Sequence, residues 1–335
     1  MAGQILSPLP SQHPRIARMV LHAFSSAVLR RFVCLGCGIV AGLLLAAWPT
    51  VATAQEAQSP EKALEAVKAR VEPAKPRLVL IYTHSAGFKH SSIDEGANAV
   101  RFLGRRTGAF DAHVSDDPAM FEPERLREFD AVVLVNTTGD WLVPKLEKGQ
   151  QLTPEQQKER AAALERRRQA LLDFVASGKG VAGFHAASDS HYNWPAYGEL
   201  IGGYFDGHPW HQKIGVKLVE PKHPLLAAFD GQGFEITDEI YQFKAPYSRD
   251  RLRVLLAVDN DTLDASKGKR QDGDYAIAWI QDHGKGRVFY SSLGHRESIY
   301  SHPQIMQFYL DGIQYVLGDI KADATPSNRL QSSGQ

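Results

Sequence analysis

Cysteine is almost absent from this sequence, which has only Cys34 and Cys37 among its 335 residues. Both lie in an N-terminal stretch that we expect to be removed after export, so the mature chain would contain no cysteine. Such a chain cannot form a disulfide, bind a metal through a thiolate or use a cysteine as its nucleophile. Any catalytic or metal site must therefore be built from other side chains.

Acidic residues are absent from the first 54 residues, whereas four arginines lie between residues 15 and 31. An apolar run follows from residue 32 to residue 48, and the stretch ends in Ala52-Thr53-Ala54. A basic start, an apolar centre and small residues at the cleavage site are typical of a signal peptide. The sequence therefore predicts a signal peptide over residues 1–54 and an exported protein, periplasmic or secreted. An uncleaved segment would tether the protein to the membrane.

An excess of charge of either sign is also missing, since 38 lysines and arginines face 38 aspartates and glutamates. Loss of the signal peptide would make this balance slightly acidic, because the peptide contains arginines and no acid. No basic stripe interleaved with aromatic residues offers a surface for a phosphate backbone. We therefore expect a small molecule as the partner and no nucleic acid.

The remaining chain has enough apolar residues to form a core, with a hydrophobic fraction of 43% over the whole sequence. Residues 55–76 are rich in Glu, Lys, Ala and Pro, and we interpret them as a charged lead-in. We predict one domain over residues 77–318. The polar end, residues 319–335, is predicted to be a disordered tail.

Continuous apolar runs alternate with amphipathic segments in the first half of this domain. Such runs are typical of buried parallel strands, and the alternation predicts an α/β fold with a doubly wound, mostly parallel sheet. Ser92 and Thr153 are predicted to cap two of the helices. Beyond residue 203 the strand-like segments follow one another without long helices, which predicts a β-rich extension. The first predicted strands are residues 78–82, 110–114, 131–135 and 181–184.

Several histidines fall where such a fold collects ligands, at or just beyond the carboxyl ends of predicted strands. His84 and the more peripheral His90 follow the first strand, and His185 follows the fourth. His295 comes shortly after a late strand, while His208 lies in a loop beyond the helix that follows His185. We expect these imidazoles to meet in one cavity. Histidines distributed at random over the surface would not be placed in this way.

Six separated motifs carry a family resemblance. They lie at residues 83–90, 180–189, 193–197, 202–208, 237–241 and 292–295, and include Gly183-Phe184-His185. In this order they resemble ThuA-like (trehalose utilisation) domains over residues 77–318. The resemblance implies a glutamine amidotransferase-like, flavodoxin-like fold and a link to carbohydrate metabolism.

In the amidotransferases that this fold resembles, a sharp turn from strand to helix presents a cysteine to a histidine and a glutamate. Here the same turn presents His185, and an imidazole does not replace a thiolate in forming an acyl intermediate. We therefore expect no glutamine amidotransferase activity. His295 and Glu297 occupy the place of the histidine and glutamate of those enzymes. Without the cysteine, we expect this pair to take no part in glutamine hydrolysis.

Histidines and carboxylates together can bind a divalent ion such as Zn²⁺, or act as general acids and bases without one. No HExxH or HxH spacing distinguishes these alternatives. Aromatic side chains near the histidines in the sequence suit a sugar, whose C–H faces stack on rings. We predict His185, His295, Glu239 and Asp189 as catalytic, His84, His208, Trp194 and Tyr241 as substrate-binding, and His84, His185, His208 and His295 as metal ligands.

The resemblance favours an enzyme of carbohydrate catabolism that acts on a glycoside or a keto sugar, as a hydrolase, lyase or isomerase. A non-catalytic carbohydrate-binding or scaffold domain is the alternative. A serine hydrolase based on Ser188 or Ser85 is a third hypothesis, but neither serine lies in a GxSxG turn.

Overall fold

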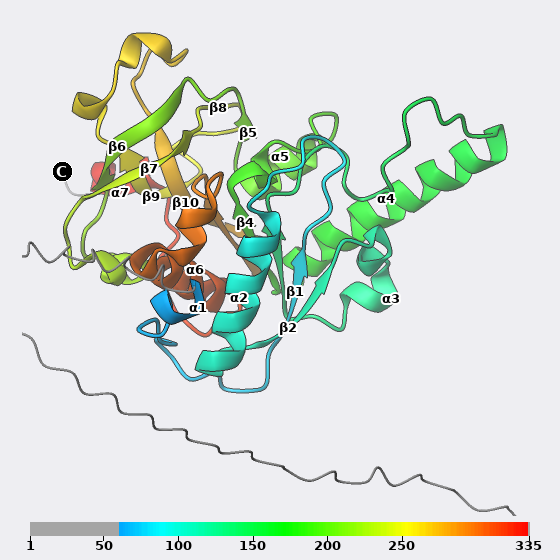
Figure 1. Cartoon of the computed structure of the whole chain (residues 1–335), viewed down its shortest axis with the longest axis horizontal. Helices are drawn as coiled ribbons and strands as arrows, with labels where there is room; N and C mark the ends of the chain where they lie inside the picture. Colours follow the sequence, from blue (N-terminus) through cyan, green and yellow to red (C-terminus); the bar gives the residue numbers. More distant parts are fainter. Residues whose placement is uncertain (1–59, 334–335) are drawn as a thin grey trace, which may run out of the picture. The chain divides into compact units, whose positions relative to one another are not determined.

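The computed structural model describes residues 60–333, and the predicted signal peptide lies outside the described residues. Its centre is a nine-stranded sheet with the order β2-β1-β3-β4-β11-β10-β9-β6-β7 (Figure 1). The strands from β2 to β11 in this order are parallel, in the sequence of neighbours that defines flavodoxin-like sheets. This confirms the predicted fold class. These strands are β1 (Leu78–Tyr82), β2 (Asp111–Ser115), β3 (Ala131–Val135), β4 (Gly180–Phe184) and β11 (Gly286–Ser291).

Strand side chains pack against helices on both faces of the sheet. Leu80 and Val132 belong to one apolar cluster and Val79 and Val133 to the other, because successive residues of a strand point to opposite faces. The first cluster includes residues of α4 and α5, and the second includes residues of α2 and α6. The bounds are α2 (Ile93–Thr107), α3 (Pro123–Leu126), α4 (Pro154–Ala176), α5 (Pro195–Ile201) and α6 (Pro303–Val316).

The predicted β-rich extension continues the same sheet with antiparallel pairing. The hairpin from β10 to β11 turns at Gly284, whose φ of 62° suits a residue without a side chain. A separate two-stranded sheet lies beside it. The extension consists of β6 (Trp210–Leu218), β7 (Phe234–Ile240), β9 (Arg253–Val258) and β10 (Ala276–His283), and the small sheet of β5 (Tyr204–Phe205) and β8 (Phe243–Lys244).

The two predicted helix caps have different outcomes. Thr153 forms a capping box with Gln156 at the start of α4, as predicted, and α4 extends beyond the sheet in Figure 1. Ser92 precedes α2 but makes no side-chain cap, because its hydroxyl donates instead to the carbonyl of Gly294 at 2.8 Å. Within residues 60–333, no helix has the length and apolar character needed to cross a bilayer.

The lead-in belongs to the folded domain from residue 60 onwards. Leu64 and Val67 are buried in the core, just after α1 (Pro60–Ala63). The guanidinium of Arg70 pairs with the buried carboxylate of Asp311 on α6 at 2.7 Å. The domain therefore begins before residue 77, because two apolar side chains within a charged segment are enough to hold it on the core.

The prediction of a disordered tail is wrong for residues 319–333. The N–H of Ser327 donates to the carbonyl of Leu252 at 3.0 Å. The guanidinium of Arg253, which is only 5% exposed, donates to the carbonyl of Thr325 at 3.0 Å. The segment ends in α7 (Ser327–Ser333). The tail is held by polar contacts to the start of β9. Such contacts produce no apolar periodicity, so the sequence did not indicate that the tail is ordered.

Deletion of residues 319–335 is expected to lower the free energy of unfolding by about 3 kcal/mol, since Arg253 would stay buried with fewer partners. Urea unfolding of the purified protein measures this change. A control truncation removes only residues 334–335 and should unfold at the urea concentration of the full chain. An unchanged midpoint in the longer deletion would show that the tail contributes nothing to stability.

Candidate functional site

His185 lies at the sharp turn between β4 and the short 3-10 helix His185–Ser188, with a φ of +46°. This left-handed conformation is uncommon for a residue with a side chain and recurs at functional sites. The ring is fully buried, and its Nδ1 lies 2.7 Å from the carbonyl of Ser292. An N–H at Nδ1 must donate there, which leaves the Nε2 lone pair facing the site. The hydroxyl of Tyr241 lies 3.1 Å from Nε2.

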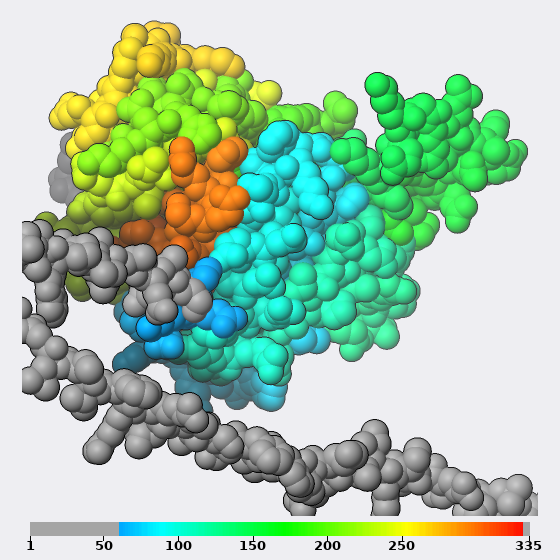
Figure 2. Space-filling view, viewed as in Figure 1, coloured from blue at the N-terminus to red at the C-terminus, as the bar shows by residue number. Residues whose placement is uncertain are grey.

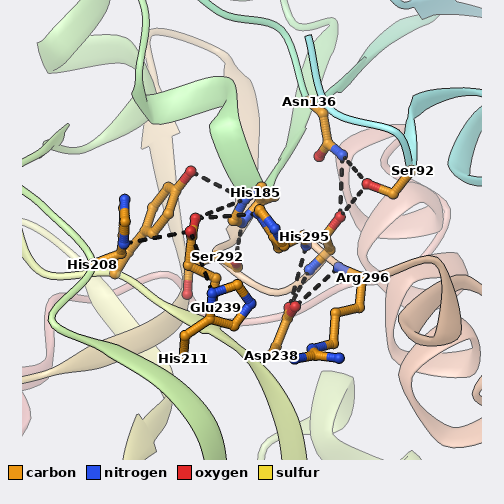
Figure 3. Close-up of polar contacts among 12 residues, drawn as sticks. Ser92, Asn136, His185, His208, His211, Asp238, Glu239, Ser292, His295 and Arg296 are labelled. Carbon is orange, nitrogen blue, oxygen red and sulfur yellow. Dashed lines mark hydrogen bonds and ion pairs between the residues drawn. The ribbon is translucent and has the colours of Figure 1, made fainter. Parts of the chain in front are cut away.

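The loop after β11 holds His295 against His185. Buried Asp238 accepts hydrogen bonds from the N–H groups of Gly294 at 2.7 Å and of Arg296 at 3.0 Å (Figure 3). Gly294 has a φ of +131°, and a β-carbon there would lie 3.3 Å from the β-carbon of His185. The same β-carbon would lie 2.5 Å from the hydroxyl of Tyr300, so glycine is required there. Asp238 therefore positions His295, a role that the sequence interpretation missed.

Asn136, at the end of β3, connects this loop to the segment before α2. Its amide nitrogen donates to the hydroxyl of Ser92 at 2.8 Å and to the carbonyl of Gly294 at 3.1 Å. Its amide oxygen accepts from the hydroxyl of Tyr300 at 3.2 Å. All these groups are buried. The loops that follow β1, β3 and β11 are therefore fixed relative to one another before any ligand binds.

Three imidazoles and one carboxylate converge in this frame. His90, His185, His295 and Glu239 each offer one ligand atom, and all four atoms lie within 4.8 Å of one another. Oε2 of Glu239 lies 3.5 Å from Nε2 of His185 and 3.3 Å from Nδ1 of His295. The ring of His90 is nearly perpendicular to the other two rings, at 88° and 89°. We call these four residues the inner cluster.

The ionised Glu239 and the neutral ring of His90 favour a cation, whereas Glu239 raises the pKa of His295, so an ion would displace a proton from that ring. Burial, followed by the neighbouring imidazoles of His185 and His295, lowers the pKa of His90 to about 3, so this ring stays neutral. Burial would raise the pKa of Glu239, but the facing imidazoles outweigh it and lower that pKa below its ordinary value. Nδ1 of His90 and Nδ1 of His295 are buried without an aligned hydrogen-bond partner. Neutral imidazoles and an ionised carboxylate are the forms that bind a metal ion.

Two further histidines face the other oxygen of Glu239. Nδ1 of His208 lies 3.4 Å from Oε1, and Nδ1 of His211 lies 4.0 Å from it. Their side chains are about half exposed, at 50% and 43%. Figure 2 shows the orange surface of the segment after β11 between the cyan surface near α2 and the green to yellow surface of the extension. We call His208 and His211 the outer pair.

A polar and aromatic wall lies beside the cluster. The hydroxyl of Tyr192 donates to Asp189 at 2.6 Å, and the ammonium of Lys244 lies 4.8 Å from the centre of the Tyr192 ring. Burial raises the pKa of Asp189, although the Tyr192 hydroxyl and His185 act against it. Near His90, the ring of Phe88 is 66% exposed. It packs edge-on against the His90 ring, with the two ring centres 4.8 Å apart.

Of the residues predicted from the sequence, His185, His295 and Glu239 belong to the inner cluster and the others lie outside it. His84 hydrogen-bonds the backbone of Val143, and neither His84 nor His208 belongs to the inner cluster, so their roles as metal ligands stay predictions. His90 lies in the cluster instead, because the loop turns back after residue 84. Trp194 is buried against Tyr197 as a core residue, which contradicts its predicted contact with a substrate. The structure places Tyr241 and His208 beside the cluster, as expected; their roles stay predictions.

The serines and the His-x-Glu pair lack the geometry of a nucleophilic site. The hydroxyl of Ser188 is buried and bonded to the hydroxyl of Tyr290 at 2.7 Å. The hydroxyl of Ser85 donates to the carbonyl of Asn136 at 3.1 Å. Glu297 is exposed and hydrogen-bonds Ser91, while His295 faces Glu239. Neither serine hydroxyl is hydrogen-bonded to an imidazole that could activate it, so the serine hydrolase hypothesis has no support.

Residues 78–316 match the ThuA family, whose description is trehalose utilisation. The chain belongs to the ThuA family. The match covers most of the chain. It includes all four residues of the inner cluster. The family resemblance of the six motifs is thereby confirmed. No match was found among curated proteins.

Two solved structures of ThuA-like proteins have the same fold. The protein from Bacteroides uniformis is 20% identical, with a TM-score of 0.55 over 76% of this chain and 97% of its own. The protein from Parabacteroides merdae is 17% identical, with a TM-score of 0.51 over 75% of this chain and 93% of its own. Identities at this level establish the fold of this ThuA-family chain and no activity.

Proposed function

We propose that this ThuA-family protein is a metal-dependent enzyme that modifies a carbohydrate, either a glycoside or a keto sugar. The observation that carries the proposal is the convergence of three imidazoles and one carboxylate from four separate segments of the chain. Nδ1 of His90 is buried without a hydrogen-bond partner, and Nδ1 of His295 has only Oε2 of Glu239 beside it, at 3.3 Å. A folded protein rarely buries such groups unless a ligand completes them.

The inner cluster suits a divalent ion such as Zn²⁺, which prefers imidazole and carboxylate ligands. When bound, the ion would act as a Lewis acid toward a sugar carbonyl or hydroxyl. The carbonyl of Ser292 keeps the Nδ1 proton of His185 in place, so Nε2 stays a ligand atom. Asp189, whose pKa is raised by burial, is suited to hold and transfer a proton beside the cluster.

Two observations support a carbohydrate as the substrate. The family is described by trehalose utilisation. Phe88 and Tyr192 expose aromatic rings near the cluster, at 66% and 42%. Aromatic faces stack on the C–H faces of sugars, while nearby polar groups bind hydroxyls. Export remains a prediction, because residues 1–54 lie outside the described residues.

The purified protein is expected to contain a divalent metal, and dialysis against a chelator is expected to remove the metal together with activity on sugars. Elemental analysis by mass spectrometry measures the metal, and turnover of glycosides and keto sugars measures activity. His295→Ala should lose both. His113→Ala removes an exposed histidine on β2 and should keep both.

Two outcomes distinguish the alternatives. A metal-free protein with full turnover would leave acid–base catalysis by the same residues. A non-catalytic carbohydrate-binding domain would bind sugars in calorimetry equally well before and after chelation, and would turn over none of them.

A further inference from the structure

We propose that Glu239 bridges two metal sites, and that Oε1 of Glu239 with His208 and His211 forms the second one. This site lies outside the inner cluster and uses the carboxylate oxygen that the cluster leaves free. The proposal rests on the proposed function, since the bridge requires an ion in the inner cluster. Its ligand is a divalent transition-metal ion of the kind that imidazoles bind.

The two oxygens of Glu239 have matching surroundings. Oε2 lies 3.3 and 3.5 Å from nitrogens of His295 and His185. Oε1 lies 3.4 and 4.0 Å from Nδ1 of His208 and of His211. Glu239 itself is only 6% exposed. One buried carboxylate is thus surrounded by imidazole nitrogens on both of its oxygens, as Figure 3 shows for His208 and His185.

The backbone holds this arrangement in register. His211 and Glu239 are direct partners across the antiparallel pair β6 and β7, so their side chains lie on the same face of the sheet. His208 lies in the short loop before β6, with its ring stacked near Phe205 at 5.8 Å. The ring of His211 also lies edge-on to the ring of His295, with centroids 4.9 Å apart, so the outer pair and the inner cluster adjoin each other around Glu239.

Each of the two distances to Oε1 suits a pair of ligand atoms on one ion. Metal–nitrogen and metal–oxygen bonds of about 2.1 Å place two ligand atoms of one ion about 3 to 4 Å apart. The outer contacts of 3.4 and 4.0 Å fall in this range. The half-exposed rings of the outer pair can turn to close on an ion. Two imidazoles and a carboxylate also form the protein ligand set of known catalytic zinc sites.

The two sites differ in their access to solvent. His90 and His185 are buried, whereas the side chains of the outer pair are 50% and 43% exposed. The inner site is therefore more enclosed than the outer site, whose exposed side keeps positions open for water or a substrate oxygen. Two ions bridged by one carboxylate would hold the attacking and leaving oxygens of one reaction.

Metal stoichiometry tests the second site without an activity assay. Metal-free protein is loaded with excess Zn²⁺, desalted and analysed, and wild type is expected to retain two ions per chain. The double variant His208→Ala/His211→Ala is expected to retain one. The matched control His113→Ala/His283→Ala removes two histidines outside the cluster and should retain two. Thermal unfolding confirms that each variant is folded.

The possible stoichiometries separate this proposal from the proposed function. One ion in wild type, unchanged in the His208→Ala/His211→Ala variant, would overturn the second site and leave the inner metal in place. No ion in wild type would overturn both. Loss of both ions in that variant would also contradict two sites, because it would make His208 or His211 a ligand of a single shared ion.

Discussion

Replacing Glu239 by glutamine is expected to weaken metal binding by about 100-fold or more, because the substitution removes a charged ligand from the ion. Glutamine has the same shape, and the side chain is nearly buried at 6% exposure, so the packing is kept. An amide is neutral, and it cannot balance a divalent ion among imidazoles. Without metal, the free energy of unfolding should fall by about 3 kcal/mol, because the buried amide loses the attraction of the carboxylate to the facing imidazoles.

Competition with a chromogenic chelator measures the metal affinity of the Glu239→Gln variant, and urea unfolding measures its stability. Glu235→Gln is the matched control, since Glu235 lies on the same strand and pairs with Lys213 at the surface at 2.9 Å. A surface pair of this kind contributes little, so the control should bind metal as wild type does. Wild-type affinity in the Glu239→Gln variant would exclude this carboxylate as a ligand.

The parallel half of the fold could be predicted from residues alone. The observed bounds of β1, Leu78–Tyr82, and of β3, Ala131–Val135, are those of the predicted strands. Both strands are buried on both faces, and continuous apolar runs report such burial directly. The order of the antiparallel strands could not be predicted, because β6 pairs with β9 and β7 through contacts between distant segments.

Some residues of the candidate site could also be predicted from the sequence, and others could not. His185 and His295 follow strand ends at the carboxyl edge of the sheet, where position in the sequence predicts position in space. His90 lies eight residues beyond β1, so its location depends on how the loop folds back. An isolated bridge between Ser85 and Thr138 directs that loop toward β3. Such a contact between loops has no periodic signal in the sequence, so the sequence does not distinguish His90 from His84 as a ligand.

His90→Ala is expected to weaken metal binding by about 100-fold or more, while His84→Ala should leave it within about twofold. The two residues form a matched pair in one loop. Burial lowers the pKa of each, and each has a buried nitrogen without a hydrogen-bond partner. Only His90 lies within 4.8 Å of the other cluster ligands. A general effect of removing a buried imidazole would therefore appear in both variants.

Stability separates a binding effect from a folding effect in this pair. Each substitution leaves a small cavity but also removes an unpaired nitrogen, so each should cost about 1 to 2 kcal/mol without metal. Added Zn²⁺ should then raise the melting temperature of His84→Ala as it raises that of wild type, because an ion that binds only the folded state stabilises it. The same shift in His90→Ala would show that the ion does not use His90. If only the His84→Ala variant failed to show the shift, the ion would bind at His84 and not at His90.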